Sequence, residues 1–100
     1  MAAVIRDDTA ARRFVTDIDG HEAELKYRLR DGRLILVHTG VPDELEGHGL
    51  GGQLVRAALA KAAAEDLIVV PLCPFARSWL ERHPDEASKV TIDWTAQSKT

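Results

Sequence analysis

The sequence predicts an α/β domain in which an antiparallel meander of strands precedes a βαβ unit within one mixed sheet. Three observations favour this fold class: alternating polar and apolar residues early in the chain, an alanine- and leucine-rich segment, and a short aliphatic run after it. A C-terminal helix and a short strand complete the prediction. At 100 residues the chain has room for one hydrophobic core. We therefore expect a single domain over residues 1–94 and a polar tail over residues 95–100.

The meander is predicted from period-two alternation. Residues 21–30 place apolar and charged side chains on opposite faces, which is typical of a strand with one solvated face. Asp19-Gly20 precedes this segment and Asp31-Gly32 follows it, and Asp-Gly readily adopts the positive φ angles of a two-residue type I′ turn. The predicted strands are residues 12–18, 21–30 and 33–39, with a further short strand at residues 4–6.

The βαβ unit follows a change in composition after Thr39. Residues 53–66 include eight Ala or Leu and no Pro or Gly, and their apolar side chains share one half of a helical wheel, which predicts a helix. Residues 67–70 are aliphatic throughout, as in a strand buried on both faces. The last meander strand and residues 67–72 should therefore run parallel in one sheet.

The C-terminal elements are predicted from the positions of two prolines. A second helix is expected to begin at Pro74, because proline fits the first helical turn. It is expected to end by His83, because Pro84 cannot continue it. Residues 89–94 are expected to form the closing strand.

Composition excludes several classes of function. Thirteen Lys and Arg against sixteen Asp and Glu give a net charge of −3, without the basic surplus of a non-specific nucleic-acid binder. A single cysteine rules out an intrachain disulfide, and no histidine pair has metal-ligand spacing, so we expect no metal. The longest nearly apolar stretch, residues 67–76, contains two prolines and is too short to cross a bilayer. With no signal-like start, we expect a cytoplasmic protein without membrane or nucleic-acid partners, and nothing indicates an oligomer.

The central motif is Glu46-Gly47-His48-Gly49-Leu50-Gly51-Gly52, between a predicted strand and a predicted helix. Glycines leave backbone N–H groups unobstructed, and the positive end of the helix favours a phosphate. A turn that merely starts a helix is the alternative. No Lys-Ser/Thr pair follows, so the motif is not a nucleotide-triphosphate loop, and a dinucleotide fold would place its glycines after the first strand of a βαβ series.

In their order and spacing these features resemble the GNAT superfamily of acetyl-CoA-dependent N-acetyltransferases, and within it a short single-domain subfamily. The glycine loop matches the family pattern Gln/Arg-x-x-Gly-x-Gly/Ala except at Glu46. The resemblance covers residues 34–85 and implies a minimal GNAT fold. The motifs that carry it are His38-Thr39-Gly40-Val41-Pro42, Gly47-His48-Gly49-Leu50-Gly51, Pro71-Leu72-Cys73-Pro74-Phe75 and Arg82-His83-Pro84.

The resemblance implies that acetyl-CoA is the cosubstrate and an amine the acceptor. In the family, a strand end pairs with the pantetheine amides, the loop N–H groups hold the pyrophosphate, and the thioester lies where two parallel strands splay apart. Pro71 would help to hold this gap open. His48 could add a donor to phosphate, or it could simply be solvated. The implied cofactor-binding residues are Thr39, Gly40, Val41, Gly47, His48, Gly49, Leu50, Gly51, Gly52 and Gln53.

The catalytic group departs from the family pattern. Larger members use a tyrosine as the acid toward sulfur, whereas this chain has Trp79 or Leu80 at that position. Cys73 is expected at or near the N-cap of the second helix, where the positive helix end favours a thiolate. It could accept the acetyl group or protonate CoA, or it could be an inert cysteine that lines the slot. His38 is a candidate base or water relay, or alternatively a locally hydrogen-bonded strand histidine.

The sequence thus favours an N-acetyltransferase whose amine acceptor is unidentified. The alternative is a CoA- or acyl-CoA-binding module with little or no transferase activity. The tight turn at Asp19-Gly20 leaves no room for the helices that build the acceptor pocket in larger relatives. The acceptor groove must therefore be open or completed by a partner, and a wide groove suits a protein or peptide amine better than a small drug-like one.

Overall fold

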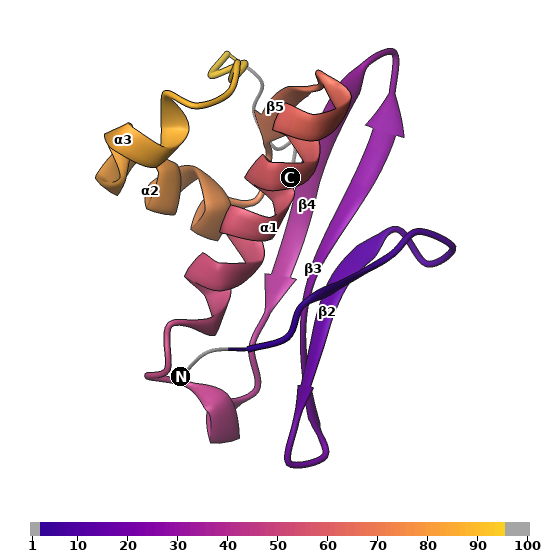
Figure 1. The fold of residues 1–100 in the computed structure, drawn as a ribbon. Coiled ribbons are helices and arrows are strands. Elements are labelled where there is room, and N and C mark those ends of the chain that lie inside the picture. Colours follow the sequence, from indigo (N-terminus) through magenta and orange to yellow (C-terminus); the bar gives the residue numbers. More distant parts are fainter. Residues whose placement is uncertain (1–2, 96–100) are drawn as a thin grey trace.

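The structure is a computed structural model that describes residues 3–95. The meander strands come first, and helices flank the last strand (Figure 1). From residue 96 onward, the predicted polar tail lies outside the described residues. The elements are β1 (Arg6–Asp8), β2 (Arg13–Ile18), β3 (His21–Arg30), β4 (Arg33–Gly40), the short 3-10 helix η1 (Asp43–Leu45), α1 (Leu50–Glu65), β5 (Ile68–Pro71), α2 (Pro74–Arg82) and α3 (Pro84–Ala87).

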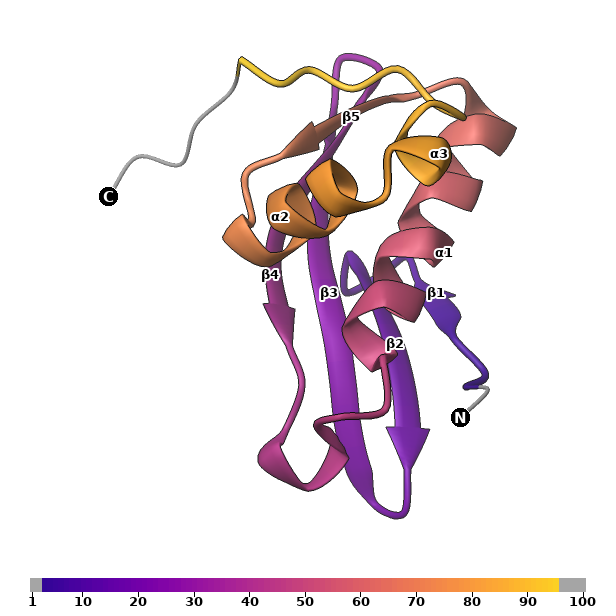
Figure 2. The ribbon, with the colours of Figure 1, turned by 90° about the vertical axis from the view of Figure 1, so that its left-hand side faces the viewer.

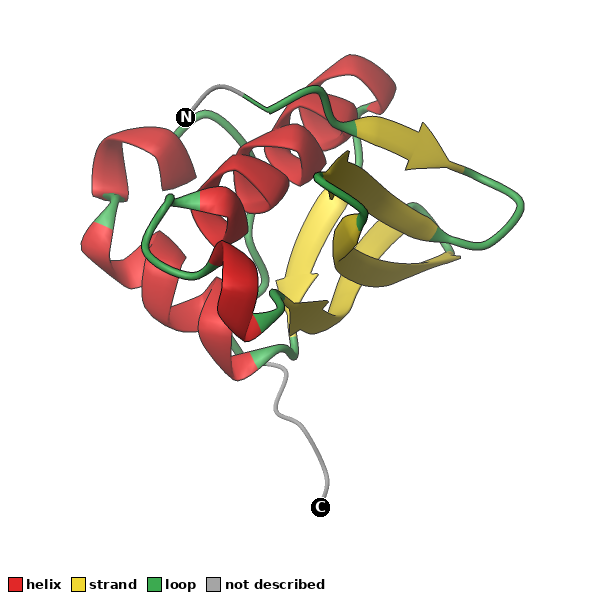
Figure 3. Cartoon of the chain, turned by 90° about the horizontal axis from the view of Figure 1, so that it is seen from below, coloured by secondary structure: helices red, strands yellow, loops and turns green. Residues whose placement is uncertain are grey.

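Within the described residues the strands form one five-stranded sheet in the order β1-β2-β3-β4-β5. Neighbouring strands from β1 to β4 are antiparallel, and β4 and β5 are parallel. The helices gather on one face of this sheet (Figure 3). At the β2–β3 turn, Asp19 and Gly20 have φ angles of 51° and 79°. At the β3–β4 turn, Asp31 and Gly32 have similar φ angles of 51° and 75°. The predicted mixed α/β fold is confirmed, and its Asp-Gly turns adopt the positive φ angles that a type I′ turn requires.

The core lies between α1 and the helix-covered face of the sheet. One side of α1 is buried along its length, as its apolar spacing predicts. Alternate residues of β3, from Ala23 to Tyr27, face it and are buried too. The principal core side chains are Phe14, Leu25, Tyr27, Leu34, Leu36, Leu50, Leu54, Val55, Leu59, Val69 and Leu80.

A β-bulge in β4 changes which of its side chains face the helices. Tyr27 pairs with Leu36, but its neighbour Lys26 pairs with His38, so Val37 is an extra residue in β4. Because side chains alternate along a strand, one extra residue reverses the phase of all that follow. Thr39, which pairs with buried Leu25, therefore lies on the helix-covered face, and His38 lies on the opposite face with Lys26.

The N-terminal boundaries of two elements differ from the prediction. The strand expected at residues 4–6 lies at Arg6–Asp8. The helix expected from residue 53 begins at Leu50, so Gly51 and Gly52 lie inside its first turn. Glycine is a poor helix former, and the contacts that stabilise this turn come from α2.

The C-terminal region differs more from the sequence-based prediction than these two elements do. Pro84 follows the end of α2 as predicted, but it also begins α3, because its fixed φ suits a first helical turn. The strand expected at residues 89–94 is reduced to one parallel bridge between Val69 and Ile92. Residues 88 and 89 form a turn after α3, which leaves only a short segment beside β5.

A polar network joins the edge strand β1 to β3 and α1. The Tyr27 hydroxyl donates to the Asp7 carboxylate, and the Lys61 ammonium lies 2.8 Å from the second oxygen of Asp7. Lys61 also lies 3.0 Å from the Glu65 carboxylate. Burial, followed by the hydrogen bond to Asp7, raises the pKa of Tyr27 to about 12. The Asp7 hydrogen bond raises the pKa of Lys61 above its ordinary value.

This network predicts the titration of Tyr27, the single tyrosine of the chain. In the folded protein, tyrosinate absorbance should rise with a midpoint near pH 12, against 10.0 for an unperturbed tyrosine. Because the fold favours the neutral phenol, its contribution to stability is complete below pH 10 and is lost as the pH rises toward 12. Asp7→Asn should lower the midpoint while the effect of burial remains. A midpoint in the native protein equal to that in denaturant would contradict the network.

Candidate functional site

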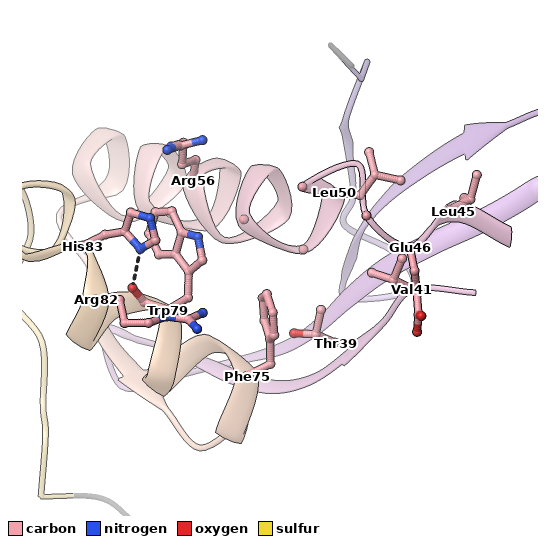
Figure 4. Close-up of a pocket in the computed structure, with 14 residues that line it drawn as sticks. Thr39, Val41, Leu45, Glu46, Leu50, Arg56, Phe75, Trp79, Arg82 and His83 are labelled. Carbon is pink, nitrogen blue, oxygen red and sulfur yellow. Dashed lines mark hydrogen bonds between the residues drawn. The ribbon is translucent and has the colours of Figure 1, made fainter. Parts of the chain in front are cut away.

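A pocket of about 650 Å³ opens between the end of β4, the glycine loop, α1 and α2. Its labelled side chains come from all four of these regions, with Phe75 and Thr39 near the middle (Figure 4). The pocket is lined by Thr39, Val41, Leu45, Glu46, Gly47, Gly49, Leu50, Gly51, Gly52, Arg56, Phe75, Trp79, Arg82 and His83.

One side of the pocket is the part of β4 that β5 leaves unpaired. The parallel ladder ends where Leu36 pairs with Pro71, and the Cys73 N–H then donates to the Leu36 carbonyl at 2.8 Å. Beyond Leu36, β4 continues to Gly40 with no strand on its β5 side among the described residues (Figure 2). Strands β4 and β5 therefore separate beside the pocket, leaving a β4 edge without a strand partner.

Cys73 lies where these two strands separate. It is the N-cap residue of α2, as predicted, and its side chain is 3% exposed. The Cys73 Sγ and Thr39 Oγ1 atoms are 3.2 Å apart, so a hydrogen bond spans the gap. Thr39 lines the pocket and Cys73 does not, so Thr39 connects the buried thiol to the pocket wall.

The glycine loop serves two separate structural purposes. Gly47 and Gly49 have φ angles of 85° and 71°, a conformation that other residues adopt only at a cost. They turn the chain into α1, whose first N–H groups have no acceptor one turn earlier in the helix. Gly51 and Gly52 lie inside the helix. A Cβ atom would lie 2.5 Å from the Phe75 ring at Gly51 and 2.6 Å from Trp79 Nε1 at Gly52. These two glycines allow α2 to approach α1 closely.

Trp79 forms the α2 wall and is held by its neighbours. The His83 ring stacks on it, with centroids 4.0 Å apart and planes 14° from parallel. His83 Nδ1 lies 2.7 Å from the Trp79 carbonyl oxygen, and because a carbonyl can only accept, Nδ1 carries the hydrogen (Figure 4). The Arg56 guanidinium lies 5.2 Å from the Trp79 ring. The indole is 5% exposed.

Charge is unevenly distributed along the pocket. Arg56, Arg82 and His83 lie at the end near Trp79, and Glu46 lies at the other end (Figure 4). Arg56 is also 3.6 Å from the carboxylate of Glu86, which is not a lining residue. The two guanidinium groups make the Trp79 end of the pocket favourable for an anion, and the N-terminus of α1 at Leu50 adds a positive partial charge nearer to Glu46 (Figure 4).

The predicted cofactor residues divide into two groups. Gly40 faces away from the pocket, His48 is exposed on the loop, and the Gln53 side chain accepts a hydrogen bond from the Ala3 N–H at 3.0 Å. His38 is exposed on the face of β4 opposite the pocket. The predicted residues that do line the pocket are Thr39, Val41, Gly47, Gly49, Leu50, Gly51 and Gly52.

Sequence reasoning assigned no binding role to the α2 side of the pocket. Phe75, Trp79 and His83 recur every four residues, which places them on one face of a helix, and this spacing is the signal that could have found them. Arg56 follows Gly52 on α1 by the same spacing. The other lining residues without a predicted binding role were Leu45 and Arg82.

The described residues contain neither a candidate metal cluster nor a helix that could span a membrane. Over residues 3–95, no three His, Cys, Asp or Glu side chains come together in a way that could hold a metal ion. None of the helices in this part of the chain is long and apolar enough to cross a membrane.

Comparison with known proteins places this geometry in context. Residues 13–90 match the model of a family described as GCN5-related N-acetyl-transferase. Protein NATD1 of Homo sapiens is 31% identical over 83 residues, which cover 80% of this chain and 74% of that protein, and NATD1 of Gallus gallus matches to the same extent with 76% covered. A solution structure of a GCN5-like putative N-acetyltransferase from Staphylococcus aureus has a TM-score of 0.69 and 28% identity, with 93% of both chains covered.

The contact between α1 and α2 predicts different effects of alanine at its two glycines. Gly52→Ala should lower the free energy of unfolding by about 1–3 kcal/mol, because the new methyl group meets the buried Trp79 indole. Gly51→Ala is the matched control: it meets the far end of the Phe75 ring, which is 38% exposed and can turn into solvent. Denaturant unfolding measures both, and equal losses would contradict the account.

Proposed function

The chain belongs to the GCN5-related N-acetyltransferase family, and on this premise we propose that it transfers an acetyl group from acetyl-CoA to an amine. The observation that carries the proposal is the continuity of one pocket. It runs from the unpaired edge of β4 at Thr39 to the N-terminus of α1. The two regions suit two parts of an acetyl-CoA molecule, the pantetheine arm with its amides and the diphosphate with its oxygens.

The residues present fit this cosubstrate. Phosphate oxygens need donors, and the first turn of α1 offers N–H groups without helical acceptors, next to two glycines that keep the approach open. Pantetheine amides need a strand edge, and β4 beyond Leu36 has no strand on its β5 side within the described residues. Bound acetyl-CoA would supply an activated thioester.

The transfer itself needs an amine nitrogen to attack the thioester carbonyl carbon. The carbon–sulfur bond then breaks, the amine loses a proton, and the CoA sulfur gains one. We assign Cys73 a direct part in this reaction: its thiol either protonates the CoA sulfur or accepts the acetyl group and passes it to the amine. The Cys73 sulfur lies beside Thr39, where the strands separate. His38 retains its proposed role as a base only for an amine that approaches from the opposite face of the sheet.

One observation favours the alternative of a CoA-binding module. Cys73 is 3% exposed and is not a lining residue of the pocket. A buried thiol can shape the slot without reacting. The two functions make the same prediction for CoA binding and differ only in turnover.

The decisive measurement is the release of free CoA thiol from acetyl-CoA with and without a panel of peptide and small amines. We expect amine-dependent release, and Cys73→Ala should slow it at least tenfold without weakening the binding of CoA. Intact mass after incubation with acetyl-CoA alone reveals any acetyl group on Cys73. Tight binding with no release for any amine would favour the binding module, and unchanged turnover in Cys73→Ala would remove the cysteine from the chemistry.

A further inference from the structure

The indole N–H of Trp79 makes no hydrogen bond within the described part of the chain. Trp79 is 5% exposed and lines the pocket. Among the described residues, Arg13 Nε is the one buried side-chain polar atom left without a partner, so Trp79 Nε1 is not sealed from solvent. Its surface opens to the pocket, where a ligand can accept the hydrogen in place of water.

The position of Nε1 shows which part of the pocket such a ligand would occupy. A Cβ atom on Gly52 would lie only 2.6 Å from Nε1, so the indole N–H lies against the first turn of α1. The backbone N–H groups of this turn have no acceptor within the helix. A side-chain donor from α2 and backbone donors from α1 thus border the same region, which is the side of Trp79 toward α1 in Figure 4.

The charges around this region favour an anion. Arg56 and Arg82 line the same end of the pocket, and the carboxylate of Glu46 lies at the other end. Glu86 offsets part of the Arg56 charge from outside the pocket, at 3.6 Å. Donors without acceptors beside two guanidinium groups suit phosphate oxygens, which accept several hydrogen bonds at once.

Trp79 is also oriented before any ligand binds. The stacked His83 ring is tied to the Trp79 backbone by its Nδ1 hydrogen bond, and the Arg56 guanidinium lies 5.2 Å from the indole ring. A donor that is already held in place gives up little conformational entropy on binding.

We propose that the Trp79 indole N–H donates a hydrogen bond to the diphosphate of coenzyme A, opposite the N-terminal amides of α1. The proposal rests on the proposed function, because it takes acetyl-CoA as the ligand. It makes α2 a phosphate-binding element and Trp79 a residue that selects nucleotide-bearing thioesters over simple pantetheine thioesters.

The chain offers an internal control, because it contains two tryptophans and hence two indole N–H signals in a ¹H–¹⁵N correlation spectrum. Trp94 lies outside this pocket, with Arg77 5.6 Å from its ring. The protein is titrated separately with CoA, dephospho-CoA, inorganic pyrophosphate and pantetheine. We expect the Trp79 signal to shift with the first three ligands and to stay in place with pantetheine, while the Trp94 signal stays in place throughout.

Trp79→Phe removes the N–H and keeps an aromatic ring against His83. It should weaken the binding of CoA and of dephospho-CoA about tenfold or more, the usual loss for a hydrogen bond to a charged group, and leave pantetheine binding unchanged. The NMR titration uses the unmodified protein, so the proposal stays testable if this variant folds poorly.

The outcomes separate this proposal from the proposed function. Tight CoA binding without a Trp79 shift, or an equal loss of CoA and pantetheine affinity in Trp79→Phe, overturns the role of Trp79 alone. A loss for CoA but not for dephospho-CoA moves the contact to the 3′-phosphate and overturns the diphosphate assignment. No binding of CoA by the unmodified protein overturns both proposals.

Discussion

The whole pocket depends on one close approach, in which the aromatic side chains of α2 lie against the first turn of α1. It depends most on Gly52, where a Cβ atom would lie 2.6 Å from the buried Trp79, whereas at Gly51 a Cβ atom would meet the end of the 38% exposed Phe75 ring at 2.5 Å. This contact holds α2 against α1 beside the point where β5 leaves β4. The glycine loop is thus a packing element as well as an entry to a helix, and its two purposes are divided between residues before and after Leu50.

The separation of β4 from β5 leaves the last residues of β4 without a strand partner on that side within the described residues. Pro71 is the last paired residue of β5, and the Cys73 N–H makes the final bond to β4 before the chain turns into α2. A proline cannot donate to a strand ladder, so it suits the point at which pairing stops. The bulge at Val37 then turns Thr39 toward the pocket, where its hydroxyl meets the Cys73 sulfur. Two local irregularities in the sheet therefore create the inner wall of the site.

The donors of the site come from elements of different kinds. Backbone N–H groups at a helix start provide a positive partial charge that no substitution of a side chain removes. The α2 wall adds side chains held by their own contacts, with Trp79 stacked on His83 and near Arg56. The start of α1 and the α2 wall thus line one pocket from two sides, with guanidinium groups at the end near Trp79 and Glu46 at the other end.

The sequence by itself determined the features that depend on local conformational preference. The alternation in β3, the Asp-Gly turns and the alanine-rich helix each depend on neighbouring residues, and the bounds of these elements were predicted to within three residues. Only the tertiary structure decided that Thr39 rather than His38 faces the pocket, because a one-residue bulge depends on the pairing with β3 and leaves no local pattern. It also decided that Trp79 and Arg56, which lie on two different helices, contact each other and line the same pocket. Local preferences act along the chain, whereas a site is assembled from parts that become neighbours only after the core has packed.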